Sequence, residues 1–542
     1  MTTQIPVLCG SETGNAEYCA EMLVKALREH GHSAEVIDME DFDPQALPGH
    51  PLVFIVTSTY GNGGPPSNAE RLLESLQTET FDLSKVRFAV CGLGSTTFDN
   101  FAQCGKDFEA AMLRGGASRV FDRVDCDDDF EEAYEGFQAT AIAYVNKHAS
   151  ELATQTSASQ APAQAQAAPS SEPRRWSRDN PALVPVVSKR LLSRAGSRKE
   201  TMHYELDLSG TGFEFEVGDC FGLHALNGDA EIQAVLSAAG LRGDELVSWN
   251  KEGTDLRTAL SRTCLAQVTG PFLTTLTALD SCRSGSASAA LAKGEDAFRV
   301  YRKERHVVDV LAEHQVRGLR AQAFVDSLRK LQPRLFSVAS PSRNLERVAF
   351  TIETVRYRWN DRAVRGVATC WLADSVNIGD KVPVYLVPNH DFRFPRDERP
   401  VIMVGPGTGI APFRGYLAEV EASAIRNHTW LFFGHQHKAT DFLYQEELAA
   451  WFKSGVLNRA DFAWSRDQDE KVYVQHKLIE RGADLWAWLQ NGAEVFVCGD
   501  AERMAPAVAH AFQTIAETVG QTNGKAFLDG LIAAGRYKTD VY

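Results

Sequence analysis

Three short apolar runs in the first hundred residues each lead into a loop of small and polar residues. The runs are residues 5–9, 52–57 and 88–91, and the loops are residues 10–16, 58–64 and 92–101. Residues 17–30 carry apolar positions at helical spacing, as expected of a helix that follows the first loop. Strands that alternate with helices predict a doubly wound parallel sheet, in which such loops meet at the carboxyl ends of the strands.

The pattern of apolar positions changes twice further along the chain. Residues 184–226 read as strands, including 202–208 and 213–217, and predict the opening of a β-barrel. Residues 229–330 become helical and rich in Leu and Ala before strands resume at Arg334, which indicates a helical insertion in the barrel. Apolar runs at 400–404, 430–433, 461–464 and 495–498 predict a second parallel sheet, so the expected fold class is multidomain α/β.

A segment of different composition separates the first predicted sheet from the barrel. Residues 154–171 carry no charge, and the stretch from Ser150 to Pro173 is made of Ser, Ala, Gln, Thr and Pro with few other residues. Such a composition buries too little apolar surface to offset its ordering entropy, so we expect a flexible linker. The predicted division is a first domain at 1–148, a linker at 149–176, a barrel with its insertion at 177–396, and a last domain at 397–542.

The net charge of −15 is concentrated in the first domain. Residues 1–150 contain 24 acidic against 10 basic residues, whereas the remaining 392 residues carry 47 against 46. This imbalance disfavours nucleic acid as a partner, and it fits equally a well-solvated domain or one that docks on a basic protein surface. The densest acidic patch, from Asp125 to Glu135, follows a strand predicted at residues 119–124.

Other classes of protein and site are disfavoured by the sequence. Ten cysteines are scattered without a Cys-x-x-Cys pair, so we expect reduced thiols and no metal site. No apolar stretch is long enough to span a membrane, and the first residues do not resemble a signal peptide. We therefore expect a cytoplasmic protein.

The first loop has the features of a phosphate-binding turn. Ser11 and Thr13 offer hydroxyls, Gly14 offers a permissive backbone, and the helix that follows offers unpaired N–H groups. Because the Gly-Lys-Ser/Thr of a triphosphate loop is missing, a monophosphate is expected. Tyr60 and Phe98, one in each of the next two loops, are placed to sandwich a planar ligand.

Two later segments indicate dinucleotide cofactors. Arg334 and Phe336 alternate onto one face of a strand, where a guanidinium can grip a pyrophosphate and a ring can pack on a flavin. Beyond the strand at 461–464 lie a hydroxyl, two cations and a ring, at Ser465, Arg466, Lys471 and Tyr473. This set suits a 2'-phosphate, and we expect no acidic residue there to accept a free ribose hydroxyl, so NADPH is favoured over NADH.

Together these motifs resemble those of the NADPH-dependent diflavin reductases. The resemblance covers the three loops of the first domain, the segment around Arg334 and the whole of the last domain. It implies a flavodoxin-like FMN domain, an FAD-binding barrel with a helical connecting insertion, and a ferredoxin-reductase-type NADP-binding domain. From Pro395 onward the sequence most resembles that of the sulfite reductase flavoprotein subunit, whereas residues 366–369 more closely resemble the NADPH-cytochrome reductases.

The resemblance assigns residues to each cofactor. For FMN they are Ser11, Glu12, Thr13, Gly14, Asn15, Ala16, Ser58, Thr59, Tyr60, Gly61, Leu93, Gly94, Ser95, Thr96, Thr97, Phe98, Asp99, Asn100 and Phe101. For FAD they are Arg334, Leu335, Phe336, Ser337, Thr351, Tyr357, Gly366, Val367, Ala368 and Thr369, with Tyr542 covering the flavin face. For NADPH they are Thr408, Ser465, Arg466, Lys471, Val472, Tyr473 and Gln475. Ser337, Cys498 and Asp540 match the trio that surrounds the reacting carbon and the flavin nitrogen.

The expected activity is electron transfer from NADPH through FAD and FMN to a haem or sirohaem protein that docks on the acidic domain. A stand-alone NADPH-haemoprotein reductase is one alternative. A flavin-bound docking protein with decayed hydride transfer is another, suggested by Phe336 where the family has Tyr and by Ala507 where it has Asp. Phe98 is a third departure, since the family usually has Tyr there.

Overall fold

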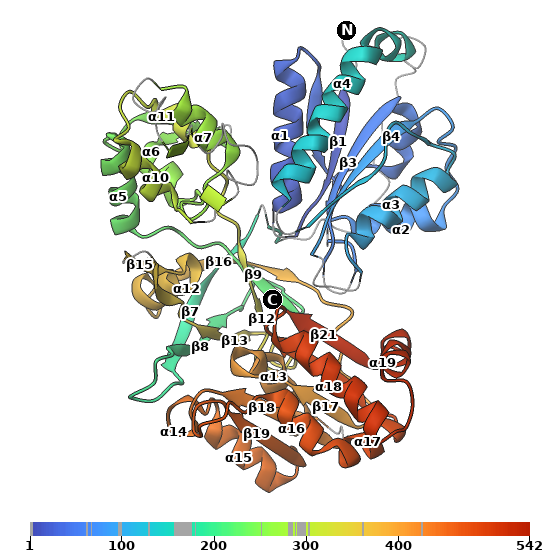
Figure 1. The fold of residues 1–542 in the computed structure, drawn as a ribbon, viewed down its shortest axis with the longest axis vertical. Coiled ribbons are helices and arrows are strands. Elements are labelled where there is room, and N and C mark those ends of the chain that lie inside the picture. Colours follow the sequence, from blue (N-terminus) through green and yellow to red (C-terminus); the bar gives the residue numbers. More distant parts are fainter. Residues whose placement is uncertain are drawn as a thin grey trace.

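The protein is described by a computed structural model in which three large sheets follow one another along the chain (Figure 1). The structure describes residues 4–12, 14–60, 63–66, 68–95, 100–127, 130–156, 176–178, 180–250, 252–279, 286–287, 289, 300–301, 304–359, 362–423 and 427–542. Within these ranges, no helix is long and apolar enough to cross a membrane. The described His, Cys, Asp and Glu side chains also form no group of three that could hold a metal ion.

The first sheet is parallel and doubly wound. Its strand order is β2 (Ala34–Asp38), β1 (Ile5–Gly10), β3 (Leu52–Ser58), β4 (Arg87–Leu93) and β5 (Ser118–Arg119), and β6 (Val124–Cys126) also pairs with β4. One face packs on α1 (Asn15–Glu29) and α4 (Glu131–Thr156), the other on α2 (Glu70–Thr78) and α3 (Gln103–Arg114). A short 3-10 helix, η1 (Pro44–Gly49), follows β2. The predicted fold of this part is confirmed, because strands buried on both faces read as continuous apolar runs.

The second sheet is an antiparallel barrel. Its order is β12 (Arg334–Ser337), β9 (Cys220–Leu223), β16 (Lys381–Val387), β7 (Ala182–Leu191), β8 (Thr201–Asp207) and β13 (Arg347–Glu353). A bridge between Val338 and Phe350 brings the chain after β12 back to β13. A separate hairpin, β14 (Arg356–Trp359) with β15 (Arg362–Arg365), precedes α12 (Val367–Cys370) and the π-helical turn η3 (Trp371–Ser375).

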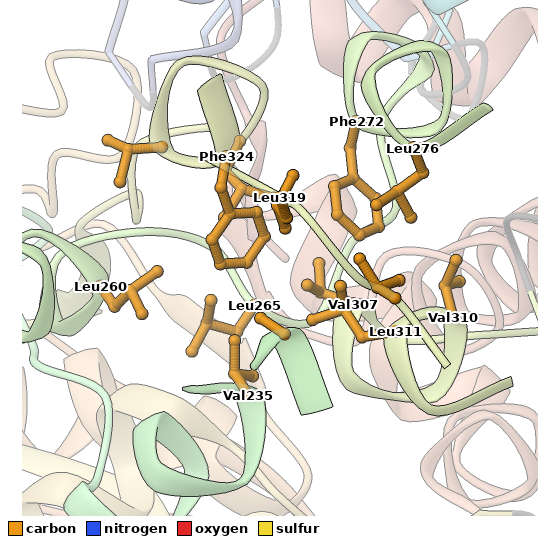
Figure 2. Close-up of a cluster of buried hydrophobic side chains, with 14 of the residues drawn as sticks. Val235, Leu260, Leu265, Phe272, Leu276, Val307, Val310, Leu311, Leu319 and Phe324 are labelled. Carbon is orange, nitrogen blue, oxygen red and sulfur yellow. The ribbon is translucent and has the colours of Figure 1, made fainter. Parts of the chain in front are cut away.

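The insertion lies between β9 and β12 and has a core of its own. It contains α5 (Asp229–Ala239), α6 (Leu256–Ser261), α7 (Gly270–Thr277), α10 (Val307–His314) and α11 (Ala321–Asp326). A hairpin of β10 (Leu246–Trp249) and β11 (Glu252–Asp255), which the sequence did not predict, interrupts the helices. Figure 2 shows Phe272 and Phe324 in a cluster that also includes Leu265 and Leu311, and the centroids of the two rings lie 5.9 Å apart.

The third sheet is again parallel, in the order β19 (Arg459–Trp464), β18 (Thr429–His435), β17 (Val401–Val404), β20 (Glu494–Gly499) and β21 (Tyr537–Val541). Its turns and helices are η4 (Gly407–Ile410), α13 (Ala411–Ala422), α14 (Lys438–Asp441), α15 (Gln445–Ser454), α16 (Val474–Glu480), α17 (Gly482–Gln490), α18 (Met504–Thr518) and α19 (Gly524–Ala533). The chain ends after β21, and Figure 1 shows this end beside β9 and β12 of the barrel.

Two predicted strands are wrong. Residues 119–124 are not one strand, because β5 ends at Arg119 and β6 begins at Val124. Arg119 and Arg123 both bind Glu109, so the chain bends between them, and Asp125 lies within β6 rather than beyond it. Residues 213–217 form no strand either: alternate side chains are buried against Phe221, but the backbone makes only one isolated bridge, at Val217.

Candidate functional site

The loop after β1 has the shape expected of a phosphate cradle. Gly14 adopts a left-handed conformation (φ 91°) at the start of α1, and its N–H donates to Ser11 Oγ at 2.9 Å. Ser11 N–H in turn donates to Asn68 Oδ1 at 2.9 Å, which ties the loop to the segment before α2. Small residues and the first-turn amides of α1 suit the monophosphate of FMN. Thr13 lies outside the described residues.

The loops after β3 and β4 are hydrogen-bonded to each other and to their neighbours. Thr59 N–H donates to Leu93 O at 2.8 Å, and Cys104 N–H donates to Thr59 Oγ1 at 3.2 Å. Gly94 N–H donates to Cys126 O at 2.9 Å. The three loops predicted to converge therefore share one edge of the sheet. Gly61, Thr96, Thr97, Phe98 and Asp99 lie outside the described residues, so the second ring of the predicted sandwich is not described.

Tyr60 lies against the barrel as well as on its own loop. Its ring packs against Cys220, Tyr385 and Val387, which come from β9 and β16. Burial raises the pKa of the Tyr60 hydroxyl well above its usual value, and nearby Cys220 and Asp540 raise it further. The edge of the first sheet that suits FMN is therefore in direct contact with the barrel.

β12 presents the residues predicted for FAD at the edge of the barrel. Arg334 is exposed, while Phe336 is half-buried with its ring centroid 6.2 Å from that of Phe350. Gly222, the register partner of Leu335, leaves room for the ring of Tyr385, which a Cβ on Gly222 would overlap. An exposed guanidinium next to a surface of aromatic rings fits a flavin dinucleotide.

The residues predicted to hold the pyrophosphate, 366–369, form the start of α12. Gly366 is its N-cap residue, and Thr369 Oγ1 accepts a hydrogen bond from Val355 N–H at 3.0 Å. Tyr357 lies on β14 and is 48% exposed, so its ring is accessible to an adenine. Thr351 is not brought to this group, because it is buried with its hydroxyl 2.7 Å from that of Tyr444.

Ser337, Cys498 and Asp540 come together although they lie far apart in the sequence. Ser337 Oγ donates to Asp540 Oδ2 at 2.7 Å, and Cys498 Sγ lies 3.7 Å from the same oxygen. Cys498 and Asp540 are register partners on β20 and β21, whereas Ser337 ends β12. The trio therefore joins the barrel to the third sheet.

Burial sets the protonation of this trio. It raises the pKa of the Asp540 carboxyl above its usual value, although hydrogen bonds from Ser337 and Cys498 act in the opposite direction. Burial and the Asp540 charge raise the pKa of Cys498, which keeps the thiol protonated. A carboxyl group whose pKa is raised toward neutrality can exchange a proton with a neighbouring hydroxyl.

Cys220 is a fourth member of this cluster that the sequence did not reveal. Its Sγ lies 3.7 Å from Ser337 Oγ, because the two residues are register partners on β9 and β12. Burial and Asp540 raise the pKa of its thiol, so it too is protonated. No local pattern marks Cys220, and only the pairing of two strands more than a hundred residues apart reveals it.

The chain end closes over the same region. The Tyr542 hydroxyl is 2.6 Å from Thr408 Oγ1, and Tyr542 N–H donates to Gly499 O at 3.0 Å. Tyr542 is 63% exposed, so its ring lies on the surface between the loop after β17 and the end of β20. This position fits a ring that covers a flavin face and moves aside for nicotinamide.

The residues predicted to bind the 2'-phosphate follow β19. Ser465 N–H donates to His435 O at 2.9 Å, and Arg466 N–H donates to Gln436 O at 3.0 Å, which fixes the turn. Tyr473 is exposed at the start of α16, next to Lys471 and Gln475. The expectation of no acidic residue is wrong, since Asp467 follows Arg466. Its carboxylate is held by His437 Nδ1 and Lys438 N–H, both at 2.9 Å, which leaves the cations for a phosphate.

Comparison with known proteins identifies each of the three parts. Family models match residues 7–137 as flavodoxin, 174–281 as an FAD binding domain, and 403–510 as an oxidoreductase NAD-binding domain.

Relatives match the chain over its whole length. The sulfite reductase [NADPH] flavoprotein alpha-component of Bacillus subtilis (strain 168) is 38% identical over 555 residues, which cover 100% of this chain and 90% of the relative. Proteins of the same name from Vibrio parahaemolyticus and Aliivibrio fischeri are 36% and 37% identical to this chain. Each match covers 99% of this chain, and it covers 86% of the first relative and 89% of the second.

These matches agree with the phosphate loop, the β12 surface and the strand-end cations. The chain is an NADPH-dependent oxidoreductase with FMN, FAD and NADPH as its cofactors. It belongs to the family of sulfite reductase NADPH flavoprotein alpha-components.

Proposed function

We propose that this protein passes electrons from NADPH through FAD and FMN to the haemoprotein component of a sulfite reductase. When bound, the flavins convert a two-electron hydride into single electrons that a haem iron can accept. The observation that carries the proposal is the Ser337–Asp540–Cys498 cluster at the junction of the barrel and the third sheet, with Tyr60 in contact beside it. Relatives that match nearly the whole of this chain supply the acceptor class, since their name is that of a sulfite reductase component.

We propose that the chain divides at 1–148, 149–176, 177–396 and 397–542 into an FMN domain, a linker, an FAD module and an NADP domain. One large sheet lies within each of the three larger parts, which supports the division into three, although α4 continues past the first boundary to Thr156. A cytoplasmic location is proposed with them, because the nine cysteines that the structure describes are all free thiols.

In this proposal the protein groups around the reacting atoms have distinct roles. Asp540 stabilises the positive charge that develops on nicotinamide as hydride leaves it, and Ser337 holds a proton at Oγ next to the flavin. Cys498 supplies a protonated thiol beside the carboxyl group of Asp540. Arg334 and residues 366–369 orient FAD, and the residues of the first-domain loops orient FMN.

Flavin content and NADPH oxidation test this function. Freshly purified protein is expected to contain FAD and FMN in equal amounts and to oxidise NADPH with ferricyanide as acceptor. Finding a single flavin would contradict the two-site assignment. NADPH that stays unoxidised would instead support a flavin-bound docking protein with decayed hydride transfer.

The acceptor is tested separately. The reduced protein is mixed with a sulfite reductase haemoprotein or with a cytochrome c, and haem reduction is followed by absorbance. Fast reduction of the sirohaem protein supports the proposal, whereas efficient reduction of the cytochrome alone favours a stand-alone haemoprotein reductase.

A further inference from the structure

Basic side chains of the FAD module contact the start of α1, next to the proposed FMN phosphate loop. Arg178 Nη2 lies 2.5 Å from Glu17 Oε2. Lys330 Nζ lies 2.7 Å from Glu21 Oε1 and 3.2 Å from Glu17 Oε1. Burial raises the pKa of Glu17, but Arg178 and Lys330 outweigh it and leave this pKa below its usual value. Glu17 is therefore ionised and neutralised by the FAD module.

Arg329 inserts more deeply into the FMN domain. It is only 6% exposed, and its guanidinium lies 4.6 Å from the ring centroid of Tyr18 and 5.0 Å from that of Phe130. It donates to Asn15 Oδ1 at 2.7 Å, and Asn15 is the first residue of α1 and the last but one of the phosphate loop. A buried guanidinium between two rings with a charge-assisted hydrogen bond is a strong contact point.

Gly14 completes the contact from the side of the phosphate loop. A Cβ built on Gly14 would overlap both Gln332 Oε1 and Arg178 Nη2. Gln332 Oε1 itself accepts from Arg178 Nη2 at 3.1 Å. The phosphate loop is thus packed against the FAD module on its outer surface. Arg329 and Gln332 reach this loop, and Lys330 reaches α1 beside it, all from one short segment before β12.

We propose that the FMN phosphate loop is also the docking surface for the FAD module, so that FMN binding and closure of the two parts strengthen each other. The inference rests on the proposed FMN site. Glu17, in the first turn of α1, repels a phosphate dianion at the same helix end when it is exposed. Docking brings Arg178 and Lys330 to Glu17 and removes that repulsion. The closed form, in which the FMN domain is docked on the FAD module, therefore binds FMN more tightly. Linkage then requires that bound FMN favours the closed form by the same factor.

The test uses the full-length holoprotein with Arg329→Ala and Lys330→Ala combined. FMN dissociation is followed by the fluorescence of released flavin, with FAD release measured in the same sample. We expect the FMN dissociation constant to rise about 5-fold or more, the lower range of typical coupling factors, with FAD release unchanged. Arg343→Ala with Arg347→Ala is the matched control, because these cations pair with Glu419 and Glu205 away from the FMN domain.

A charge reversal and a reciprocal measurement separate the outcomes. Lys330→Glu places a third carboxylate beside Glu17 and Glu21 and should weaken FMN binding further, and adding Glu21→Lys should restore part of it.

By small-angle X-ray scattering, FMN-depleted wild-type protein should be more extended than the holoprotein. The same scattering measurement is made on the variants. If they are extended but bind FMN with wild-type affinity, or if they stay as compact as the wild type, the proposed coupling is wrong while the FMN site stands. If wild-type protein binds no FMN, the proposed site itself fails.

Discussion

At the scale of single residues, the site depends on a carboxyl group whose acidity is set by burial. Asp540 has a raised pKa, and it is the ionised form that stabilises positive charge on nicotinamide. The rate of FAD reduction by NADPH should therefore fall as pH decreases through this pKa, and the decrease should begin above the usual value for Asp of about 4.

Asp540→Asn should lower that rate by about two to three orders of magnitude and remove this acid dependence. Stopped-flow measurement of flavin bleaching across a pH series checks both effects, with FAD content as the control for folding. A variant that keeps the same acid dependence would assign the titration to another group.

Coenzyme choice is also decided by individual side chains. Arg466→Ala with Lys471→Ala should weaken NADPH far more than NADH, because only NADPH carries the 2'-phosphate. Charge-assisted hydrogen bonds contribute about 1.5 to 3 kcal/mol each, so loss of two should lower the preference in kcat/KM by about two to four orders of magnitude. An equal loss for both coenzymes would show that these cations do not bind the phosphate.

At the scale of elements, the sequence predicts the parallel strands well and the contacts between distant elements poorly. Strands that are buried on both faces require continuous apolar runs, and such runs predict β1, β3, β4, β17, β18 and β20. The prediction of a strand at 213–217 is wrong because alternating burial requires only an extended backbone, not one that is hydrogen-bonded to a neighbouring strand. β21, which carries Asp540, has no apolar run, and its contact with Ser337 spans 203 residues.

The contact between β8 and the third part of the chain predicts a pH-dependent stability. His203 Nδ1 lies 2.9 Å from the hydroxyl of Tyr444, and Glu205, Arg190 and Arg414 surround the pair. The pKa of His203 is lowered to about 4, chiefly by burial and also by Arg414, while Glu205 acts in the opposite direction. The unfolded chain therefore binds this proton first as pH decreases, so stability should fall between about pH 6.5 and 4, by up to about 3 kcal/mol.

His203→Gln removes this titration and can still bond to Tyr444. Its Tm should therefore fall less than that of the wild type between pH 7 and 5. The exposed His510 provides the control, since His510→Gln should leave the wild-type dependence intact. Parallel curves for all three proteins would show that His203 does not contribute to acid destabilisation.

At the scale of the whole molecule, the acidic patch predicted at Asp125 to Glu135 is divided between several contacts. Asp125 pairs with Arg123, and Glu131 lies 3.9 Å from Arg329 of the insertion. Asp128 and Asp129 lie outside the described residues. The part of the patch that starts α4 therefore faces the FAD module. We propose that the FMN domain docks on this module and on a basic acceptor in turn, with the linker allowing the exchange.

Reversing Asp127, Asp128 and Asp129 to Lys tests the docking of the acceptor. Electrostatic docking depends on salt, and a haem acceptor must reach FMN, whereas ferricyanide also takes electrons from FAD. The variant should reduce a haem acceptor more slowly than the wild type at low salt while reducing ferricyanide at the same rate. Glu29, Glu74 and Glu79, exposed on α1 and α2 or just beyond, allow a control with the same change in charge. If the variant reduces haem at the wild-type rate at every salt concentration, the patch does not attract the acceptor and is only a solvated surface.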